Sequence, residues 1–118
     1  MCLILFAYKT HRQFPLIVAA NRDEFYNRPT EAAAFWPDHP DLLAGKDLRG
    51  GGTWLGVTRT GRFAALTNYR DPNGMNPDAP TRGNIIIDYL IGGDASEGYL
   101  HQLAETSYQY NKYSVILG

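Results

Sequence analysis

Two apolar runs at the start of the chain predict a β-hairpin. Residues 2–8 and 14–20 are almost wholly apolar, and the polar segment 9–13 between them has the length of a hairpin loop. Both runs are apolar at odd and even positions alike. We therefore expect these strands to be covered on both faces, in the middle of a layered structure.

The middle of the chain predicts a loop and then a second hairpin. Prolines at positions 29, 37 and 40 surround a short alanine run, which favours a long ordered loop after residue 24. Residues 53–59 and 62–69 then flank the turn at 60–61 as two strands. The glycines at 50–52 accept backbone angles closed to other residues and let another segment approach closely.

The last third of the chain changes to a helical period. A helix is predicted over residues 82–91, with an apolar side formed by Ile86, Tyr89 and Leu90. Asp94 and Glu97 have the spacing of a capping box, which predicts a second helix with an apolar side formed by Leu100, Leu103 and Ala104. Residues 113–118 are typical of a further β-strand.

Composition narrows the class of protein. At 118 residues, with 44% hydrophobic residues and a net charge of -1, the chain has the make-up of one globular domain or part of one. Eleven basic residues are scattered among twelve acidic ones, so we expect neither nucleic acid nor an anionic membrane as a partner. No apolar stretch approaches the ~20 residues that span a bilayer as a helix.

The cysteine and histidine residues indicate the cell compartment of the protein and whether it has a metal site. The single cysteine cannot form an internal disulfide, and no charged segment precedes a long apolar run, so we expect a cytoplasmic protein. His11, His39 and His101 are isolated in the sequence, without metal-binding spacing. The prediction is therefore no metal site and no cofactor.

Cys2 is the first candidate for chemistry. Removal of Met1 would leave a thiol and a free α-amine on one residue, so that the nucleophile carries its own base. The thiol and the amine titrate within about one pKa unit of each other, so the proton transfer costs little. The alternative is that a lone cysteine in an apolar strand is a small buried hydrophobe.

The predicted first hairpin brings charged residues to this cysteine. Its second strand runs antiparallel to the first and delivers the segment Asn21-Arg22-Asp23-Glu24 to the end where Cys2 lies. An acid there holds an ammonium group, and an arginine favours a thiolate or binds a substrate carboxylate. Asn68, at the end of the second hairpin, is a candidate donor to a developing oxyanion. A solvated turn and a loop cap are the alternatives.

Several segments in order resemble the NRDE family, also called the transport and Golgi organisation protein 2 family. They are Met1 to Phe6, Ala20 to Glu24 with Arg28-Pro29, Ala44 to Asp47, Gly51 to Gly56, Leu66 to Arg70, and Thr81 to Gly83, followed by a strand-like segment at 113–117. On these motifs we place catalysis on Cys2, Arg22, Asp23 and Asn68, and substrate binding on Asn21, Glu24, Trp54 and Arg82. Which of Arg22, Asp23 and Glu24 acts stays open.

The resemblance implies a fold and a reaction. It implies an α+β protein, an αββα four-layer sandwich of the N-terminal nucleophile hydrolase type. Residues 1–118 are expected to be the N-terminal part of one such domain. The implied activity is an amidohydrolase with an N-terminal cysteine nucleophile, acting on a small-molecule linear amide other than a peptide.

A second function is implied by the same resemblance. The alternative is a non-catalytic binding or trafficking protein, concerned with Golgi organisation and with haem or lipid homeostasis, and only under this alternative is haem a ligand. So short a chain buries only part of its strand surface, so we expect a homo-oligomer or a missing C-terminal half to complete it.

Overall fold

The computed structural model describes residues 2–118. These residues form two antiparallel sheets and two α-helices. A two-stranded sheet is formed by β1 (Leu3–Tyr8) and β2 (Leu16–Asn21). A five-stranded sheet has the order β3 (Thr30–Trp36), β4 (His39–Asp47), β5 (Leu55–Thr58), β6 (Phe63–Asn68) and β7 (Tyr113–Leu117). The helices are α1 (Gly83–Ile91) and α2 (Ser96–Thr106), followed by a 3-10 turn at Ser107–Gln109.

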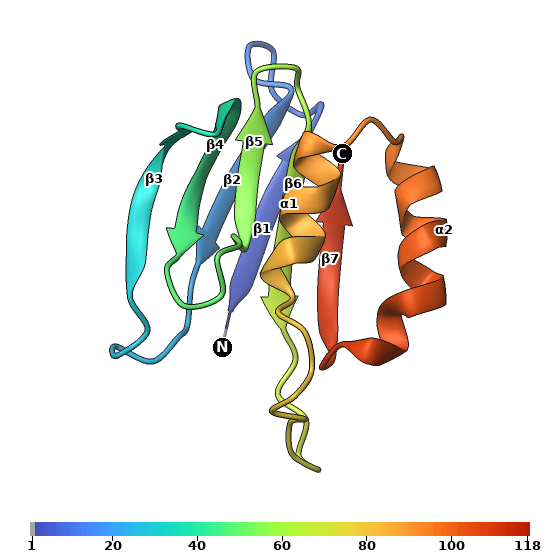
Figure 1. Ribbon diagram of the computed structural model, residues 1–118. Coiled ribbons are helices and arrows are strands. Elements are labelled where there is room, and N and C mark those ends of the chain that lie inside the picture. Colours follow the sequence, from blue (N-terminus) through green and yellow to red (C-terminus); the bar gives the residue numbers. More distant parts are fainter. Residues whose placement is uncertain (1) are drawn as a thin grey trace.

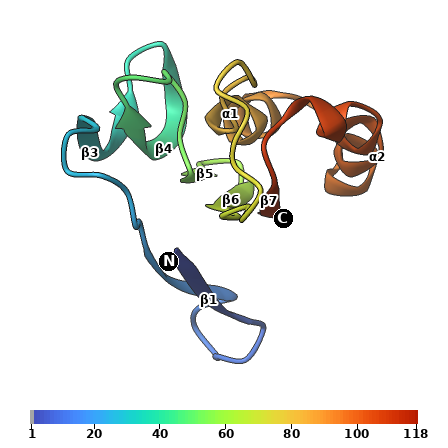
Figure 2. The same ribbon diagram turned by 90° about the horizontal axis from the view of Figure 1, so that it is seen from below.

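The elements are arranged in three layers. Figure 1 shows α1 in front of the five-stranded sheet, with α2 beside it beyond β7. Figure 2, seen from below, shows the β1–β2 hairpin on the opposite side of that sheet from the helices. The observed fold is therefore mixed α+β, with a helical layer, a sheet layer and a hairpin layer.

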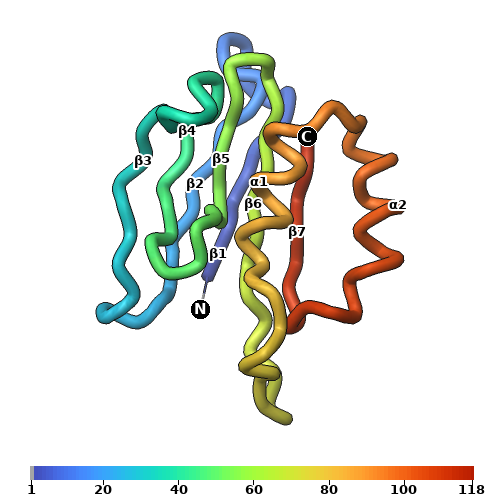
Figure 3. Tube along the Cα trace, viewed as in Figure 1, coloured from blue at the N-terminus to red at the C-terminus, as the bar shows by residue number. Residues whose placement is uncertain are grey.

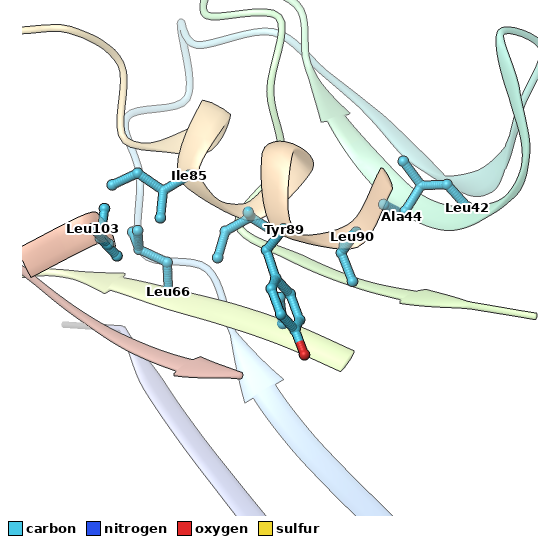
Figure 4. Close-up of a cluster of buried hydrophobic side chains, with 9 residues drawn as sticks. Leu42, Ala44, Leu66, Ile85, Tyr89, Leu90 and Leu103 are labelled. Atoms are coloured by element: carbon cyan, nitrogen blue, oxygen red, sulfur yellow. The ribbon is translucent and has the colours of Figure 1, made fainter. Parts of the chain in front are cut away.

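The core lies between α1 and the sheet. Ile85 and Ile86 of α1 are 1% and 0% exposed, and they pack with Leu66 of β6 and Leu42 of β4. Figure 4 shows Ile85 close to Leu66, with Leu103 of α2 on the same side of the cluster and Ala44 and Leu42 on the other. The expected apolar side of the first helix is confirmed, because Ile86, Tyr89 and Leu90 are all buried.

One end of the molecule collects the loops that carry the predicted site. The first hairpin pairs antiparallel with Leu3 opposite Asn21, so the start of the chain lies beside the end of β2. The chain trace in Figure 3 shows the loop after β4, the loop after β6 and the start of α1 at this same end. The sheet layers therefore position the loops, and the loops supply the polar groups.

The expectation of a long loop after residue 24 is wrong, because β3 and β4 form a hairpin there. Residues of β3 pair with β4 in an irregular register, for example Ala34 with Ala44, and only the short segment between the two strands is a turn. Trp36 fastens the pair by donating its indole N–H to the Ala44 carbonyl at 3.0 Å. Pairing with β4 overrides the local signal of alanines and prolines.

The expectation that the first hairpin is covered on both faces is also wrong for the described residues. Ile4, Leu16 and Val18 are half-buried. On the opposite face Leu3, Leu5 and Ile17 are 55%, 60% and 43% exposed. Among residues 2–118 no element covers this outer face, because the five-stranded sheet takes only the inner one.

The second helix differs from its prediction in its N-cap and in part of its apolar side. It begins at Ser96 with Ala95 as N-cap and without a side-chain cap, so the Asp94 capping box is wrong. The Asp94 carbonyl instead accepts a hydrogen bond from Arg62 at 2.7 Å. Leu103 is buried as expected, but Leu100 and Ala104 are exposed. Tyr99 packs on α1 in their place, its ring 5.3 Å from that of Tyr89.

Candidate functional site

Cys2 lies at the entrance to β1, against the backbone of the segment after β2. Its thiol is half-buried and free, and Sγ accepts the backbone N–H of Asp23 at 3.4 Å. The thiol also faces the Asp23 carbonyl oxygen at 3.8 Å, a long contact for a weak donor. The antiparallel register of the first hairpin therefore brings the predicted nucleophile and the predicted charged segment together.

Within that segment each side chain has a different contact. Asn21 accepts the backbone N–H of Leu3 through Oδ1 at 2.7 Å, which fixes the start of β1. The Asp23 carboxylate is 3.5 Å from the exposed guanidinium of Arg70. Glu24 accepts the backbone N–H of its neighbour Phe25 at 3.0 Å. The segment is thus an ordered polar turn beside the thiol.

Arg22 turns toward the five-stranded sheet. Its guanidinium carbon lies 4.5 Å from the centre of the Trp54 ring, a cation–π distance. Trp54 in turn lies over Gly45, where an added Cβ would be 3.0 Å from the indole. The structure therefore joins two residues predicted for the site, Arg22 and Trp54, across the two sheets.

An ion pair that the sequence did not indicate lies beside this contact. Arg28 donates from Nε and Nη2 to one oxygen of Asp47, at 2.9 and 2.6 Å. Burial alone would raise the pKa of Asp47. The hydrogen bonds from Arg28 and from the backbone N–H groups of Gly50 and Arg49 outweigh it, so the pKa lies below its ordinary value. The pairing also raises the pKa of Arg28.

Arg82, at the start of α1, completes a cluster of polar side chains that we call the polar corner, which consists of Cys2, Asp23, Glu24, Arg28, Asp47 and Arg82. It is half-buried, and its Nη1 donates to the Lys112 carbonyl at 2.8 Å. Burial lowers the pKa of Arg82, and the nearby positive charge of Arg28 adds to that shift. Glu24 and Cys2 act in the opposite direction. Arg82 is thus electrostatically coupled to the predicted nucleophile and to the predicted acid.

Glycines permit this close assembly of loops. Gly52 lies against the backbone of Gly83, where a Cβ would be 2.5 Å from the Gly83 carbonyl carbon. Gly51 has a φ of +75°, a left-handed conformation that favours glycine. The predicted role of residues 50–52 as a close-approach segment is confirmed, because they let the β4–β5 loop touch the start of α1.

Asn68, the remaining residue predicted for the site, makes no hydrogen bond to the Cys2 thiol. Asn68 is the exposed last residue of β6, opposite Tyr113. Among residues 2–118 the hydrogen-bond partners of the Cys2 thiol are backbone groups of Asp23, so Asn68 is not joined to it. Sequence reasoning placed no function on Arg28, Asp47 or Arg70. Only their positions in resemblance motifs pointed to them, because their pairing spans loops from different elements.

The described side chains form no metal-binding group. Residues 2–118 contain no group of three or more histidine, cysteine, aspartate or glutamate side chains able to hold a metal ion. Of the three histidines, His11 and His101 are exposed, and His39 is half-buried at the start of β4.

Within the described part of the chain, neither α1 nor α2 has the length and apolar character needed to cross a bilayer. Part of each helix lies in the core instead, through Ile85, Ile86, Tyr89 and Leu90 of α1 and Leu103 of α2.

Comparison with known proteins places the chain in a family. Residues 1–118 match the family model described as Transport and Golgi organisation 2. The chain belongs to this family. The match covers both sheets and both helices, and so it includes every residue of the polar corner around Cys2.

Named relatives of this family member come from mammals and from fly. It is 39% identical over 123 residues to the Transport and Golgi organization 2 homolog of Mus musculus, covering 98% of this chain and 44% of that protein. The corresponding homolog of Homo sapiens is 37% identical, with 98% and 44% covered. Transport and Golgi organization protein 2 of Drosophila melanogaster is 35% identical, with 97% and 43% covered. The chain spans less than half the length of these relatives.

Proposed function

We propose that the protein acts in transport and Golgi organisation as a cytoplasmic binding protein, with the polar corner around Cys2 as its ligand site. The observation that carries this proposal is the family match over residues 1–118, together with relatives in mouse, human and fly that are named for transport and Golgi organisation. The corner supports a binding role because guanidinium, carboxylate and thiol groups from several loops meet there.

A chimera in fly cells tests the binding role. Residues 1–118 replace the matching part of the Drosophila relative, so that the rest of that protein is kept, and the chimera is expressed in cells depleted of the relative. We expect secretion of a reporter and Golgi staining to be restored. Cys2→Ser should restore both, because a hydroxyl keeps a polar group of similar size at this position and binding needs no thiolate nucleophile. A chimera that is expressed and folded but restores neither would contradict the proposal.

A second candidate is an amidohydrolase with an N-terminal cysteine, and the contact between the Cys2 sulfur and the Asp23 backbone favours it. Removal of Met1 lies outside the described residues and is part of this proposal. The thiol passes its proton to the new α-amine and attacks the carbonyl carbon of a linear amide. The C–N bond then breaks, the leaving amine takes the proton, and a thioester remains until water hydrolyses it.

The side chains of the corner have roles in this second candidate. Arg22, Asp23 or Glu24 orients the amine and the substrate, and Asn68 donates to the oxyanion. The proposed scaffold is the four-layer αββα sandwich, of which residues 1–118 form the N-terminal part. The three observed layers and the greater length of the relatives support this assignment.

Intact mass and thiol labelling test the hydrolase. A species lacking Met1 whose Cys2 reacts with iodoacetamide at pH 7 is expected, and Cys2→Ser should abolish both the labelling and any amide turnover. Retention of Met1 together with an unreactive thiol would contradict the hydrolase and leave the binding role in place. The rescue by Cys2→Ser described above separates the two candidates in cells.

A further inference from the structure

One guanidinium at the polar corner lacks a carboxylate partner. Among residues 2–118 no carboxylate oxygen lies within 4.0 Å of the Arg82 nitrogens, although the side chain is half-buried. Its only hydrogen bond within that range goes from Nη1 to the Lys112 carbonyl. A guanidinium has five N–H donors in a planar fork, so most of them are left without a protein acceptor.

The acids nearby are already engaged elsewhere. Asp47 accepts both donors of Arg28 and two backbone N–H groups of its own loop. Asp23 is 3.5 Å from Arg70, and Glu24 accepts the N–H of Phe25. Among the described residues Arg82 therefore has no carboxylate in contact, although it is partly desolvated. At longer range it interacts unfavourably with the charge of Arg28 and favourably with Glu24 and Cys2.

Gly50 lets polar groups from three segments pack closely. A Cβ on Gly50 would lie 2.9 Å from the Thr81 hydroxyl, 3.2 Å from Asp47 Oδ2 and 3.4 Å from Arg28 Nη2. The Thr81 hydroxyl, the Asp47 carboxylate and the Arg28 guanidinium therefore surround one point next to Gly50. Arg82 follows Thr81 directly and forms the N-cap of α1, whose first turn contains no acidic residue.

We propose that Arg82, with Arg28 and Thr81 beside it, binds the anionic group of the ligand that the Cys2 corner accepts, a carboxylate or a phosphate. The planar fork of a guanidinium matches the oxygens of either group. Asp47 already balances the charge of Arg28, so the attraction for an anion comes mainly from Arg82. The inference rests on the proposed function only in taking the corner as a ligand site. It holds for a carried molecule and for an amide substrate alike.

Titration of the purified protein tests this site without any cell assay or turnover. Inorganic phosphate and N-acetylglycine are the two probes, added at constant ionic strength while NMR follows the Arg82 Nε–H and the amides of Gly83 and Asn84. Saturable shifts with either probe support the site. Phosphate alone indicates a phosphorylated ligand, and N-acetylglycine alone indicates a carboxylate. No saturable shift with either probe overturns the proposal.

Variants locate the binding. Arg82→Gln should weaken binding by roughly tenfold or more, because charge-assisted hydrogen bonds are lost. Arg59→Gln is the matched control, since Arg59 lies between β5 and β6, stacked on Phe35, and should leave binding unchanged. If Arg82→Gln fails to fold, Arg82→Lys is measured instead. Lysine keeps the positive charge but lacks the planar set of guanidinium donors. An anion affinity that is unchanged in Arg82→Lys would overturn the assignment of the site to Arg82.

The outcome is independent of the proposed function. Anion binding by the purified protein with failed rescue of fly cells would leave this site standing and remove the transport role. Rescue of the cells by a protein that binds no anion would support the transport role and remove the anion site.

Discussion

At the scale of single residues, the site consists of charged groups whose partners come from distant parts of the chain. Arg28 and Asp47 are 19 positions apart, and their side chains are 29% and 13% exposed. Such a pair is shielded enough that losing one member leaves the other without compensation. The exposed pair of Arg59 and Asp41, at 3.9 Å, is a contrasting case in the same protein.

Replacing Asp47 tests this difference. Asp47→Asn should lower the free energy of unfolding by about 1–3 kcal/mol at pH 7, because Arg28 and two loop N–H groups lose a charged acceptor. The measurement is urea unfolding followed by circular dichroism. Asp41→Asn is the control, and we expect it to change stability by less than about 0.5 kcal/mol.

Acid should remove the effect of the Asp47 substitution. The folded-state pKa of Asp47 is below its ordinary value, so its contribution is present above the unfolded pKa of ~3.9 and is lost as pH falls through the lower folded pKa. The difference between wild type and Asp47→Asn should therefore narrow below about pH 4. A difference that is constant from pH 7 to pH 3 would show that the carboxylate charge is not its source.

At the scale of elements, the glycine contact between the β4–β5 loop and α1 sets the position of the site. Gly52 touches the backbone of Gly83, and backbone cannot rotate aside as a side chain can. The contact holds Arg82, which precedes α1, beside the loop that carries Asp47.

A methyl group at Gly52 should disturb this contact. Gly52→Ala places a Cβ 2.5 Å from a backbone carbon, and we expect a loss of about 1–3 kcal/mol of unfolding free energy. Gly98→Ala is the control, since Gly98 lies inside α2 facing open space and should stabilise the helix by up to about 1 kcal/mol. Equal melting temperatures for wild type and Gly52→Ala would contradict the contact.

At the scale of the whole molecule, the first hairpin exposes a sheet face formed by apolar side chains. Leu3, Leu5 and Ile17 share that face, opposite the one that meets the five-stranded sheet. Exposed apolar surface of this kind promotes association, and both strands of a two-stranded sheet are also edges.

We expect this protein to self-associate through the outer face of the hairpin. Sedimentation velocity over a range of concentrations should show a reversible larger species. Leu5→Lys should shift the equilibrium toward monomer by about tenfold, because a charge replaces an apolar contact. Tyr108→Lys, at an exposed position on the 3-10 turn, is the control and should have no effect. A wild-type protein that stays monomeric throughout would refute the expectation.

Much of the local structure was predictable from the sequence, and the errors have identifiable causes. The hairpin of β1 and β2 and its antiparallel direction followed from two apolar runs and a short polar loop, and this alone placed Cys2 beside Asn21 and its neighbours. The strand at 30–36 was missed because alanines carry little β signal and its partner β4 supplies the pairing. The Asp94 capping box was wrong, because α2 begins one residue later than it requires, with Ala95 as N-cap.

The sequence by itself determined the first hairpin, the strands around residues 60–61, both helices and the last strand, and which end of the first hairpin carries the cysteine, because these depend on periodicity and on neighbours within some twenty residues. It did not determine the hairpin of β3 and β4. Only the tertiary structure decided which charges meet. The pairs of Arg28 with Asp47 and of Asp23 with Arg70 arise where loops from both sheets and α1 converge. Arg82 lies at the same place and has no carboxylate partner among residues 2–118. Contacts between residues so far apart depend on how the layers stack, and stacking is set by the burial of the whole core.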